Sequence, residues 1–215
     1  MQLIDAILFD PVGCLAEFPS EQFNEIAVRF FNRRKKASKS GSRSYWHLLN
    51  LIETADKKLD ETVEVLEIQA VDGASAYDDV IPALSELKAM GVKLIIASSL
   101  SNAAVTVFLE KFGLNDFFSA VWNRDNGGGI KAAPLARAID NAFLNPKQVM
   151  FLTDTVEGLK VANALGLNSI LMMNDHDEAR RLAMHDPAGG IVSLHELPDF
   201  IRLVAAENAT RVRQT

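Results

Sequence analysis

Short apolar runs recur along this chain, and most are separated by stretches in which apolar residues follow the spacing of a helix. Apolar runs of this length, bounded by turn signals, are typical of strands that are buried on both faces of a sheet. Strands that alternate with helices form parallel sheets with right-handed crossovers. The sequence therefore predicts a doubly wound α/β fold, with strands expected at 3–9, 92–97, 119–122, 149–154, 168–172 and near 190–192.

The alternation of strands and helices is interrupted between residues 16 and 79. Within this interval apolar residues recur only at helical spacing, and a serine is placed to cap the first helix. The helical patterns run through 20–31, 46–52 and 59–66. We therefore predict a Rossmann-like core domain formed by residues 1–15 and 80–215, and an inserted all-helical cap domain formed by residues 16–79.

A basic segment that is rich in serine, Arg33–Arg43, lies inside the predicted cap. Its composition is typical of a helix end followed by a loop. Two interpretations remain open for it. The segment is either simply solvated, or it closes over the site and holds an anionic substrate.

The composition argues against several classes of function. A net charge of −6 is unfavourable for general binding of nucleic acid or of membrane surfaces. The sequence has no apolar run near the roughly 20 residues that span a bilayer, and no signal pattern at its start. The single cysteine, Cys14, excludes an intrachain disulfide and favours a reducing compartment. We therefore expect a cytoplasmic protein.

Polar residues follow or end several of the predicted strands. Asp10 comes directly after the first apolar run, where open α/β sheets bind ligands in the crevice at the strand ends. An isolated aspartate at such a place also commonly caps a turn. Ser98 and Asp154 end two later runs, and Lys131 follows a glycine-rich loop. Taken singly, a serine there is a usual helix cap and a loop lysine is usually solvated.

The run from Asp10 to Leu15, Asp-Pro-Val-Gly-Cys-Leu, resembles the first motif of the haloacid dehalogenase superfamily, Asp-x-Asp-Gly-Thr-Leu. The resemblance implies that Asp10 is a nucleophile. Val12 stands where most members have a second aspartate, which protonates the leaving group and later activates water. Cys14 replaces the threonine, and it is either a small buried residue or a reactive thiol.

The later strand ends match the remaining motifs of the same superfamily in the same order. The resemblance implies that the Ser98 hydroxyl holds a phosphoryl oxygen and that the Lys131 ammonium screens the nucleophile's charge from an incoming anion. Ser99 and Cys14 are further candidates for contact with the substrate. The fourth motif, Gly-Asp-x-x-x-Asp, is matched here at its first acid by Asp154.

The resemblance also implies a magnesium site, from which this sequence departs. The family's ligands are the nucleophile, the carbonyl of the residue two positions on and the acids of the fourth motif, here Asp10, Val12 and Asp154. Gly158 replaces the last acid. Glu157 is a poor substitute, because one residue turns a helical side chain by about 100°. We therefore expect Mg²⁺ to bind, if at all, to a weakened site.

These residues predict a hydrolase that acts on a small phosphorylated metabolite through an Asp10 aspartyl intermediate. Without an acid at position 12 the loss in rate could reach about 10²–10⁴. The main alternative is a catalytically degenerate relative that binds an anionic ligand or a protein partner.

Two kinds of relative work without the second aspartate of the first motif. The 2-haloacid dehalogenases use an asparagine and an aspartate after the fourth strand, which are Thr155 and Gly158 here. Phosphonoacetaldehyde hydrolases form a Schiff base with a lysine of the cap. The cap lysines of the basic segment are exposed in this prediction, and exposed lysines lack the desolvation that activates an amine. These lysines are Lys35, Lys36 and Lys39.

Overall fold

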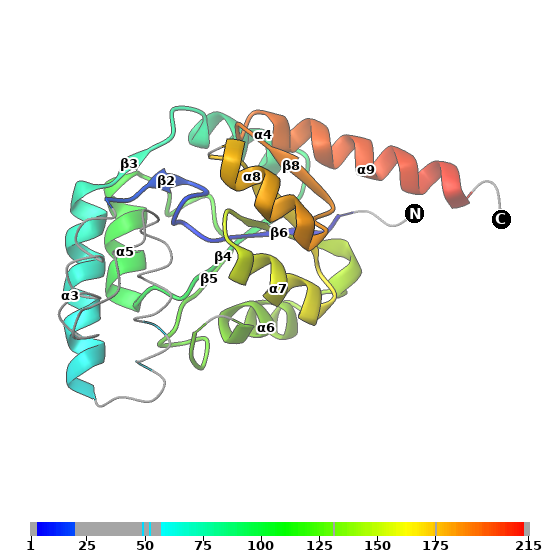
Figure 1. Ribbon diagram of the computed structural model, residues 1–215. Coiled ribbons are helices and arrows are strands. Elements are labelled where there is room, and N and C mark those ends of the chain that lie inside the picture. Colours follow the sequence, from blue (N-terminus) through cyan, green and yellow to red (C-terminus); the bar gives the residue numbers. More distant parts are fainter. Residues whose placement is uncertain are drawn as a thin grey trace.

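A computed structural model of the chain describes residues 4–19, 49, 52, 57–130, 132–174 and 176–212. Within these residues a six-stranded sheet has the strand order β5-β4-β1-β6-β7-β8, and its neighbouring strands are parallel (Figure 1). This confirms the predicted parallel α/β fold, and each strand lies within a few residues of its predicted place. The strands are β1 (Ala6–Phe9), β4 (Lys93–Ala97), β5 (Ala120–Trp122), β6 (Val149–Thr153), β7 (Asn168–Met172) and β8 (Gly189–Ile191).

The central strand, β1, pairs with β4 on one side and with β6 on the other. Its residues are completely buried, which explains why its sequence is a continuous apolar run without alternation. Phe9 lies opposite Ile96 of β4 and Leu152 of β6. The carboxyl ends of these three strands therefore meet at one edge of the sheet, and so do the residues that follow them.

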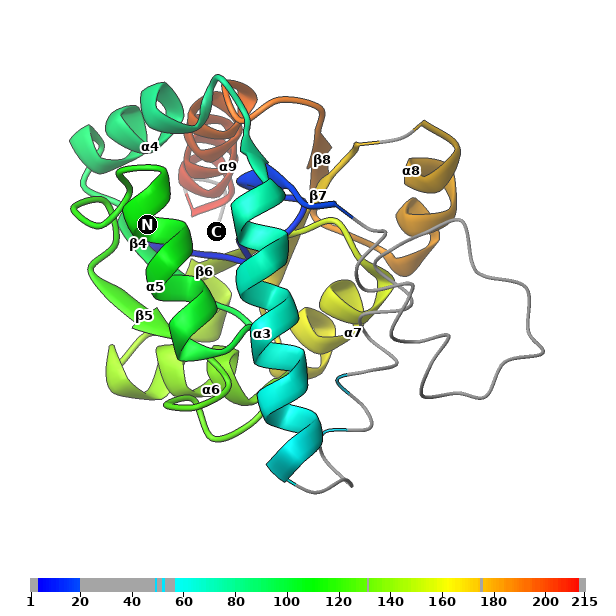
Figure 2. The same cartoon turned by 90° about the vertical axis from the view of Figure 1, so that its left-hand side faces the viewer.

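Helices cover both faces of the sheet (Figures 1 and 2). The two buried apolar clusters identify which helices share a face with one another. One face is covered by α4 (Val80–Ala89), α5 (Asn102–Lys111) and α9 (Glu196–Val212). The other face is covered by α6 (Ala132–Asn141) and α7 (Val156–Leu165). The shorter elements are α8 (His176–Leu182) and two 3₁₀ turns, Pro146–Gln148 and Ala183–His185.

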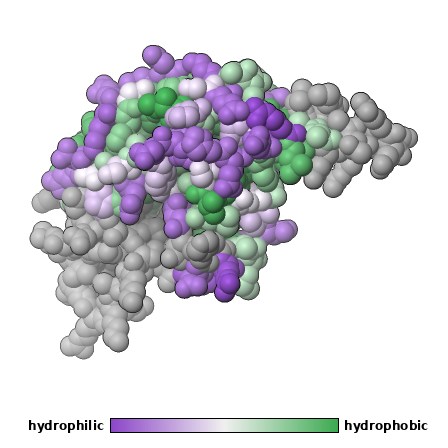
Figure 3. Space-filling model, turned by 90° about the horizontal axis from the view of Figure 1, so that it is seen from above, coloured by the Kyte–Doolittle hydropathy of each residue, from purple (hydrophilic) through white to green (hydrophobic). Residues whose placement is uncertain are grey.

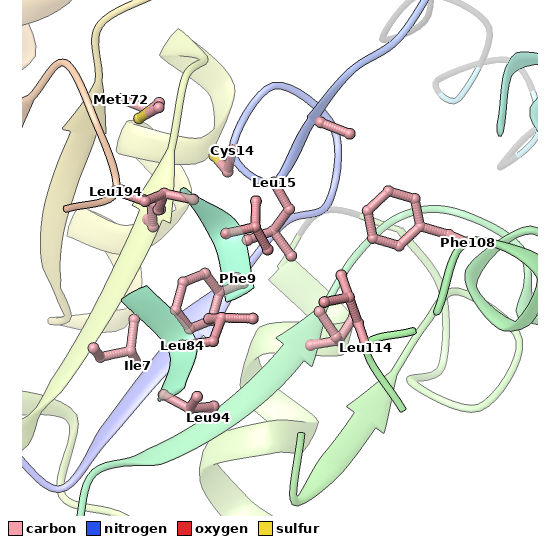
Figure 4. Packing of buried hydrophobic residues seen from close by; sticks show 14 of the residues in the cluster. Ile7, Phe9, Cys14, Leu15, Leu84, Leu94, Phe108, Leu114, Met172 and Leu194 are labelled. Atoms are coloured by element: carbon pink, nitrogen blue, oxygen red, sulfur yellow. The ribbon is translucent and has the colours of Figure 1, made fainter. Parts of the chain in front are cut away.

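Successive residues of β1 enter opposite layers of the core, as the alternation of a strand requires. Ile7 and Phe9 pack in the same cluster as Leu84 of α4 and Phe108 of α5 (Figure 4). Leu8 belongs to the second cluster, with side chains from α6 and α7. Burying a side chain of this size stabilises a fold by about 1.5–3 kcal/mol. This packing fixes β1, and with it the start of the loop that follows.

The outer surface over α4, α8 and α9 is largely hydrophilic (Figure 3). Its apolar side chains lie in small separate groups on this face. Ile81 of α4 and Leu203 of α9 are among the exposed apolar residues. Among the residues that the structure describes, no helix has the length and apolar character to cross a membrane.

The interval predicted to form the cap contains a short antiparallel ribbon that the sequence did not indicate. The strands β2 (Ala16–Glu17) and β3 (Ser75–Ala76) pair with each other, which corrects the expectation of helices alone between residues 16 and 79. Strands of two residues are too short to show an alternating pattern. The ribbon brings the beginning and the end of the interval together, and the division into core and cap stays a prediction.

The third helical pattern of the interval is present as α3 (Lys57–Gly73), which lies beside α5 (Figures 1 and 2). Leu49 and Ile52, from the second pattern, are also helical. The first predicted helix, the basic segment and its lysines lie outside the described residues. Lys111 of α5 holds the C-terminal end of α3 and the residue after it, because its ammonium donates hydrogen bonds to three carbonyl oxygens there. These belong to Val71 (2.9 Å), Asp72 (2.6 Å) and Ala74 (2.9 Å).

Candidate active site

The loop after β1 is a tight turn that brings two carboxylates to the same place. Gly13 has φ +72°, a conformation that side chains rarely adopt, and a Cβ there would lie 1.9 Å from Oδ2 of Asp154. Glycine is therefore required both for the backbone and for the space. The Asp154 carboxylate, which follows β6, packs directly on the turn that begins at Asp10.

Asp10 and Ser98 are in direct contact across the ends of neighbouring strands. The Ser98 hydroxyl donates a hydrogen bond of 3.0 Å to Oδ1 of Asp10, and the Val12 amide lies 3.4 Å from the same oxygen. Burial raises the pKa of Asp10 to about 6, although both hydrogen bonds act in the opposite direction. At neutral pH most of the Asp10 carboxyl is therefore ionised, as a nucleophile needs to be.

Cys14 has no exposed surface and is close enough to both carboxylates to feel their charge. Burial raises the pKa of its thiol well above the ordinary value, and the negative charges of Asp154 and Asp10 raise it further. The Asp154 amide donates to the sulfur, which acts weakly in the other direction. The thiol is consequently protonated at physiological pH and is a poor nucleophile. Of the two interpretations of Cys14, the buried packing residue fits this environment.

Asn174 and Tyr77 hold the outer side of the same turn, and the sequence analysis did not single out either of them. The Asn174 amide nitrogen lies 2.8 Å from the Gly13 carbonyl and 3.5 Å from Oδ2 of Asp154. The Tyr77 hydroxyl lies 3.4 Å from both the Gly13 carbonyl and Oδ1 of Asn174. Asn174 follows β7, so it could have been predicted from its place at the end of a parallel strand. Tyr77 is brought to the site by the β2–β3 ribbon, and no local sequence pattern marks it.

The segment after β6 differs from the family's fourth motif in its packing as well as in its sequence. Thr155 caps α7, because its hydroxyl accepts a hydrogen bond of 3.0 Å from the Gly158 amide. A Cβ at position 158 would lie 2.0 Å from Oγ1 of Thr153 and 2.8 Å from its Cβ. The Thr153 side chain thus fills the space that an acidic residue at position 158 would need.

A narrow pocket adjoins Asp10, with room for about one water molecule. It lies where α6 and α7 begin, on the face of the sheet that these helices cover. Ser99, another candidate for substrate contact, is one of its polar residues. Lys131 lies outside the described residues. The residues that line the pocket are Asp10, Ala97, Ser99, Leu135, Phe151, Thr155, Gly158 and Val161.

The carboxylates around the turn form a reduced donor set for a metal ion. Among the described residues, no group of three or more His, Cys, Asp or Glu side chains is arranged to hold one. Asp10 and Asp154 remain, on either side of Gly13. Mg²⁺ is commonly held by one or two carboxylates, with water and substrate phosphate completing the octahedron. The residues present therefore fit a two-carboxylate magnesium site that depends on the substrate for further oxygens.

The parallel α/β fold thus places Asp10, at the end of β1, in contact with the hydroxyl that follows the neighbouring strand β4, an arrangement that suits a hydrolase. The chain belongs to the family described as haloacid dehalogenase-like hydrolases, whose model matches residues 4–172. This family membership agrees with the resemblance noted in the sequence motifs.

Individual relatives are similar over different lengths. Enolase-phosphatase E1 of Shewanella pealeana is 29% identical over 105 residues, which are 47% of this chain and 46% of that protein. The chain thus spans about half the length of the curated relatives it matches. A haloacid dehalogenase-like hydrolase of Streptococcus pneumoniae has the same fold, with a TM-score of 0.72 and 18% identity over 93% of this chain and 99% of the other. L-2-haloacid dehalogenase of Xanthobacter autotrophicus, with chloropropionic acid covalently bound, gives a TM-score of 0.64 and 19% identity over 93% and 99%.

Proposed function

We propose that this protein hydrolyses a small phosphorylated metabolite, with Asp10 as the nucleophile. The observation that carries the proposal is the contact between Asp10 and Ser98 at the end of the central strand, with Asp154 packed against the same turn. The phosphatase relatives in the family support phosphate as the group transferred. We place the activity in the cytoplasm, where the lone, buried Cys14 needs no disulfide partner.

The reaction proceeds in two displacements at phosphorus. An Asp10 carboxylate oxygen attacks, the bond from phosphorus to the leaving oxygen breaks, and that oxygen departs with the electron pair. Water then attacks the phosphorus of the acyl-phosphate, which releases inorganic phosphate and restores the carboxylate. Ser98 and Ser99 hold the non-bridging oxygens, and Lys131 offsets the negative charge that builds up as the anion approaches.

Asp10 and Asp154, with the Val12 carbonyl, would hold Mg²⁺ when the substrate is present. A bound Mg²⁺ neutralises phosphate charge and orients the group that is transferred. Val12 has no proton to give to a leaving group. Turnover is therefore restricted to substrates whose leaving group departs readily as an anion. The segment 16–79 acts as the cap over this site.

A second candidate function is binding without turnover, of an anionic ligand or of a protein partner. The specific observation in its favour is the filled space at Gly158, which leaves the last motif position without an acid. Dehalogenation of haloacids is less favoured, because Thr155 caps α7 and Gly158 carries no side chain for the roles of an asparagine and an aspartate. Phosphonate hydrolysis would need an activated cap lysine.

The proposal is tested by a screen of phosphate esters, acetyl phosphate, phosphonates and haloacids, with and without Mg²⁺. Wild type should hydrolyse activated phosphates, and Asp10→Asn should abolish that activity, because an amide neither carries the charge nor forms the acyl-phosphate. Asp199→Asn, a change of the same kind on the exposed side of α9, is the control and should keep full activity. Undiminished turnover by folded Asp10→Asn protein would show that the chemistry lies elsewhere.

A further inference from the structure

A buried group of charges joins α3 to the sheet domain. Glu67 of α3 has no exposed surface, and Arg124, which follows β5, is 6% exposed. Nη1 of Arg124 lies 2.7 Å from each carboxylate oxygen of Glu67. The Nε and Nη2 atoms of the same guanidinium lie 3.0 Å and 2.9 Å from Oδ1 of Asp60. Asp60 and Glu67 are about two turns apart and so share one face of α3.

The same two residues, mainly through their side chains, hold the backbone of the loop that follows β4. The Ser101 amide donates a hydrogen bond of 2.9 Å to Oε2 of Glu67. Nη1 of Arg124 lies 3.3 Å from the Ser99 carbonyl oxygen, and the Arg124 amide donates to the Leu100 carbonyl at 3.1 Å. Each residue of the loop segment 99–101 is therefore attached to Glu67 or to Arg124.

This loop segment also determines where Ser98 lies. The Leu100 amide donates a hydrogen bond of 3.2 Å to the Ser98 hydroxyl oxygen, and that hydroxyl donates to Asp10. A continuous series of contacts thus runs from α3 through the charged pair and the loop to the Asp10 carboxylate. Figure 2 shows α3 alongside α5, the helix that begins where this loop ends.

Several amides at the start of α5 and in its cap residue are already used by protein groups. The Ser101 amide donates to Glu67, the Asn102 amide to Asp125 at 2.7 Å, and the Ala104 amide to the Ser101 hydroxyl at 3.2 Å. Negative charge at a helix N-terminus is favourable, so Glu67 and Asp125 take the place that an anionic ligand could occupy. We therefore expect contact with a phosphoryl group at this strand end from Ser98 and Ser99.

We propose that Glu67 and Arg124 are positioning residues for the hydrolysis, which hold the loop segment 99–101 so that Ser98 meets Asp10 and Ser99 faces the substrate. This inference rests on the proposed function. A buried ion pair is costly, and apolar residues of similar volume often stabilise a fold at least as well. Apolar residues could not hold the Ser99 carbonyl and the Ser101 amide, and this is the task that the charged pair performs.

The test is the double variant Glu67→Met/Arg124→Met, which removes both charges together and leaves no unpaired buried charge at these two positions. The Asp60 side chain is 41% exposed and can be solvated. We expect a melting temperature close to that of wild type, together with faster amide hydrogen exchange in residues 98–104. With p-nitrophenyl phosphate as substrate, kcat should fall by about 10²-fold, the usual cost of a misplaced reacting group. KM should change much less, because Ser98 contacts the group that reacts.

Three further variants separate positioning from stability. Arg202→Gln removes the exposed ion pairs of Arg202 with Glu86 of α4 and with Asp199 of α9, and it should leave both loop exchange and kcat unchanged. Glu67→Gln keeps the size of the side chain, so it replaces the double variant in the same measurements if the double variant does not fold. Arg124→Lys keeps the positive charge but loses the planar fork of the guanidinium. Its loop protection from hydrogen exchange and its kcat should therefore lie between those of the double variant and those of wild type.

Unchanged loop exchange in a folded variant that lacks the pair would overturn the inference, whatever its activity. Faster exchange with an unchanged kcat would overturn it as well, because the loop would then be irrelevant to the reaction. If wild type hydrolyses none of the esters, the proposed function has failed. The exchange measurement then still decides whether Glu67 and Arg124 hold the loop.

Discussion

Gly158 and Thr153 are packed so closely that a side chain at one position excludes the side chain at the other. A Cβ at position 158 would stand 2.0 Å from Oγ1 of Thr153. The family's fourth motif has glycine at the first of these positions and an acid at the last, whereas this chain has threonine and glycine. An acid at position 158 would therefore clash with Thr153, and we expect that a single substitution does not restore the family's last motif position.

The first prediction follows from this exclusion. Gly158→Asp alone should destabilise the protein by about 1–3 kcal/mol, the usual cost of forcing extra atoms into a packed site. Adding Thr153→Gly should relieve that clash and raise the affinity for Mg²⁺, measured by calorimetric titration. Gly158→Ala, with and without Thr153→Gly, is the matched control, because it tests the clash without adding a carboxylate. Tight Mg²⁺ binding by Gly158→Asp alone would contradict the steric argument.

The second prediction concerns Gly13, whose replacement should cost more than its backbone conformation alone explains. Gly13 and Gly113 have similar positive φ values, +72° and +66°. A Cβ at position 113 would meet nothing within 4 Å, whereas one at position 13 would lie 1.9 Å from Asp154. Gly113→Ala should therefore lose about 1 kcal/mol or slightly more, and Gly13→Ala clearly more, in urea unfolding. Equal losses would mean that Asp154 moves aside freely.

The third prediction is a pH dependence of stability that comes from Asp10. Its pKa is about 6 in the folded protein, against roughly 3.9 in an unfolded chain. The folded state therefore binds the proton more tightly, so this contribution to stability is fully present below about pH 4 and is lost as the pH rises through about 6. The loss amounts to about 2–3 kcal/mol.

Asp10→Asn has no such titration and provides the comparison. In metal-free buffer, its unfolding free energy relative to wild type should increase between pH 4 and pH 8. Chemical denaturation of both proteins at several pH values measures the difference. A constant difference across that range would show that the environment of Asp10 does not disfavour the carboxylate.

The fourth prediction concerns the leaving group and Val12. Sugar phosphates leave as alkoxides and benefit from a proton, whereas p-nitrophenolate and acetate leave readily without one. Wild type should therefore favour activated esters. Val12→Asp should raise kcat on a sugar phosphate more than on p-nitrophenyl phosphate, by part of the about 10²–10⁴ that general acid help supplies. Val12→Asn, of the same size without the acid, is the control. If wild type hydrolyses both substrates equally fast, the missing proton donor is not limiting.

Local sequence determined the strands and the candidate residues at their ends. The inner strands β1, β4 and β6 are largely continuous apolar runs because both faces of the sheet are covered there, so their places and the fold class followed from the sequence. Asp10, Ser98 and Asp154 were found because the residue at the end of a parallel strand faces the edge where ligands bind. The roles of these residues, and that of Lys131, remain predictions that the variants above can test.

Tertiary structure decided what surrounds these residues. The contacts of Thr153 with Gly158, of Gly13 with Asp154 and of Glu67 with Arg124 join positions with no shared local pattern, from 5 to 141 residues apart in the sequence. The β2–β3 ribbon escaped notice because two residues cannot show a period. Sequence patterns report which face of an element is buried, whereas space and charge at a site depend on which elements meet there. For this protein, the elements that meet at the site set the pKa of Asp10 and fill the space at position 158.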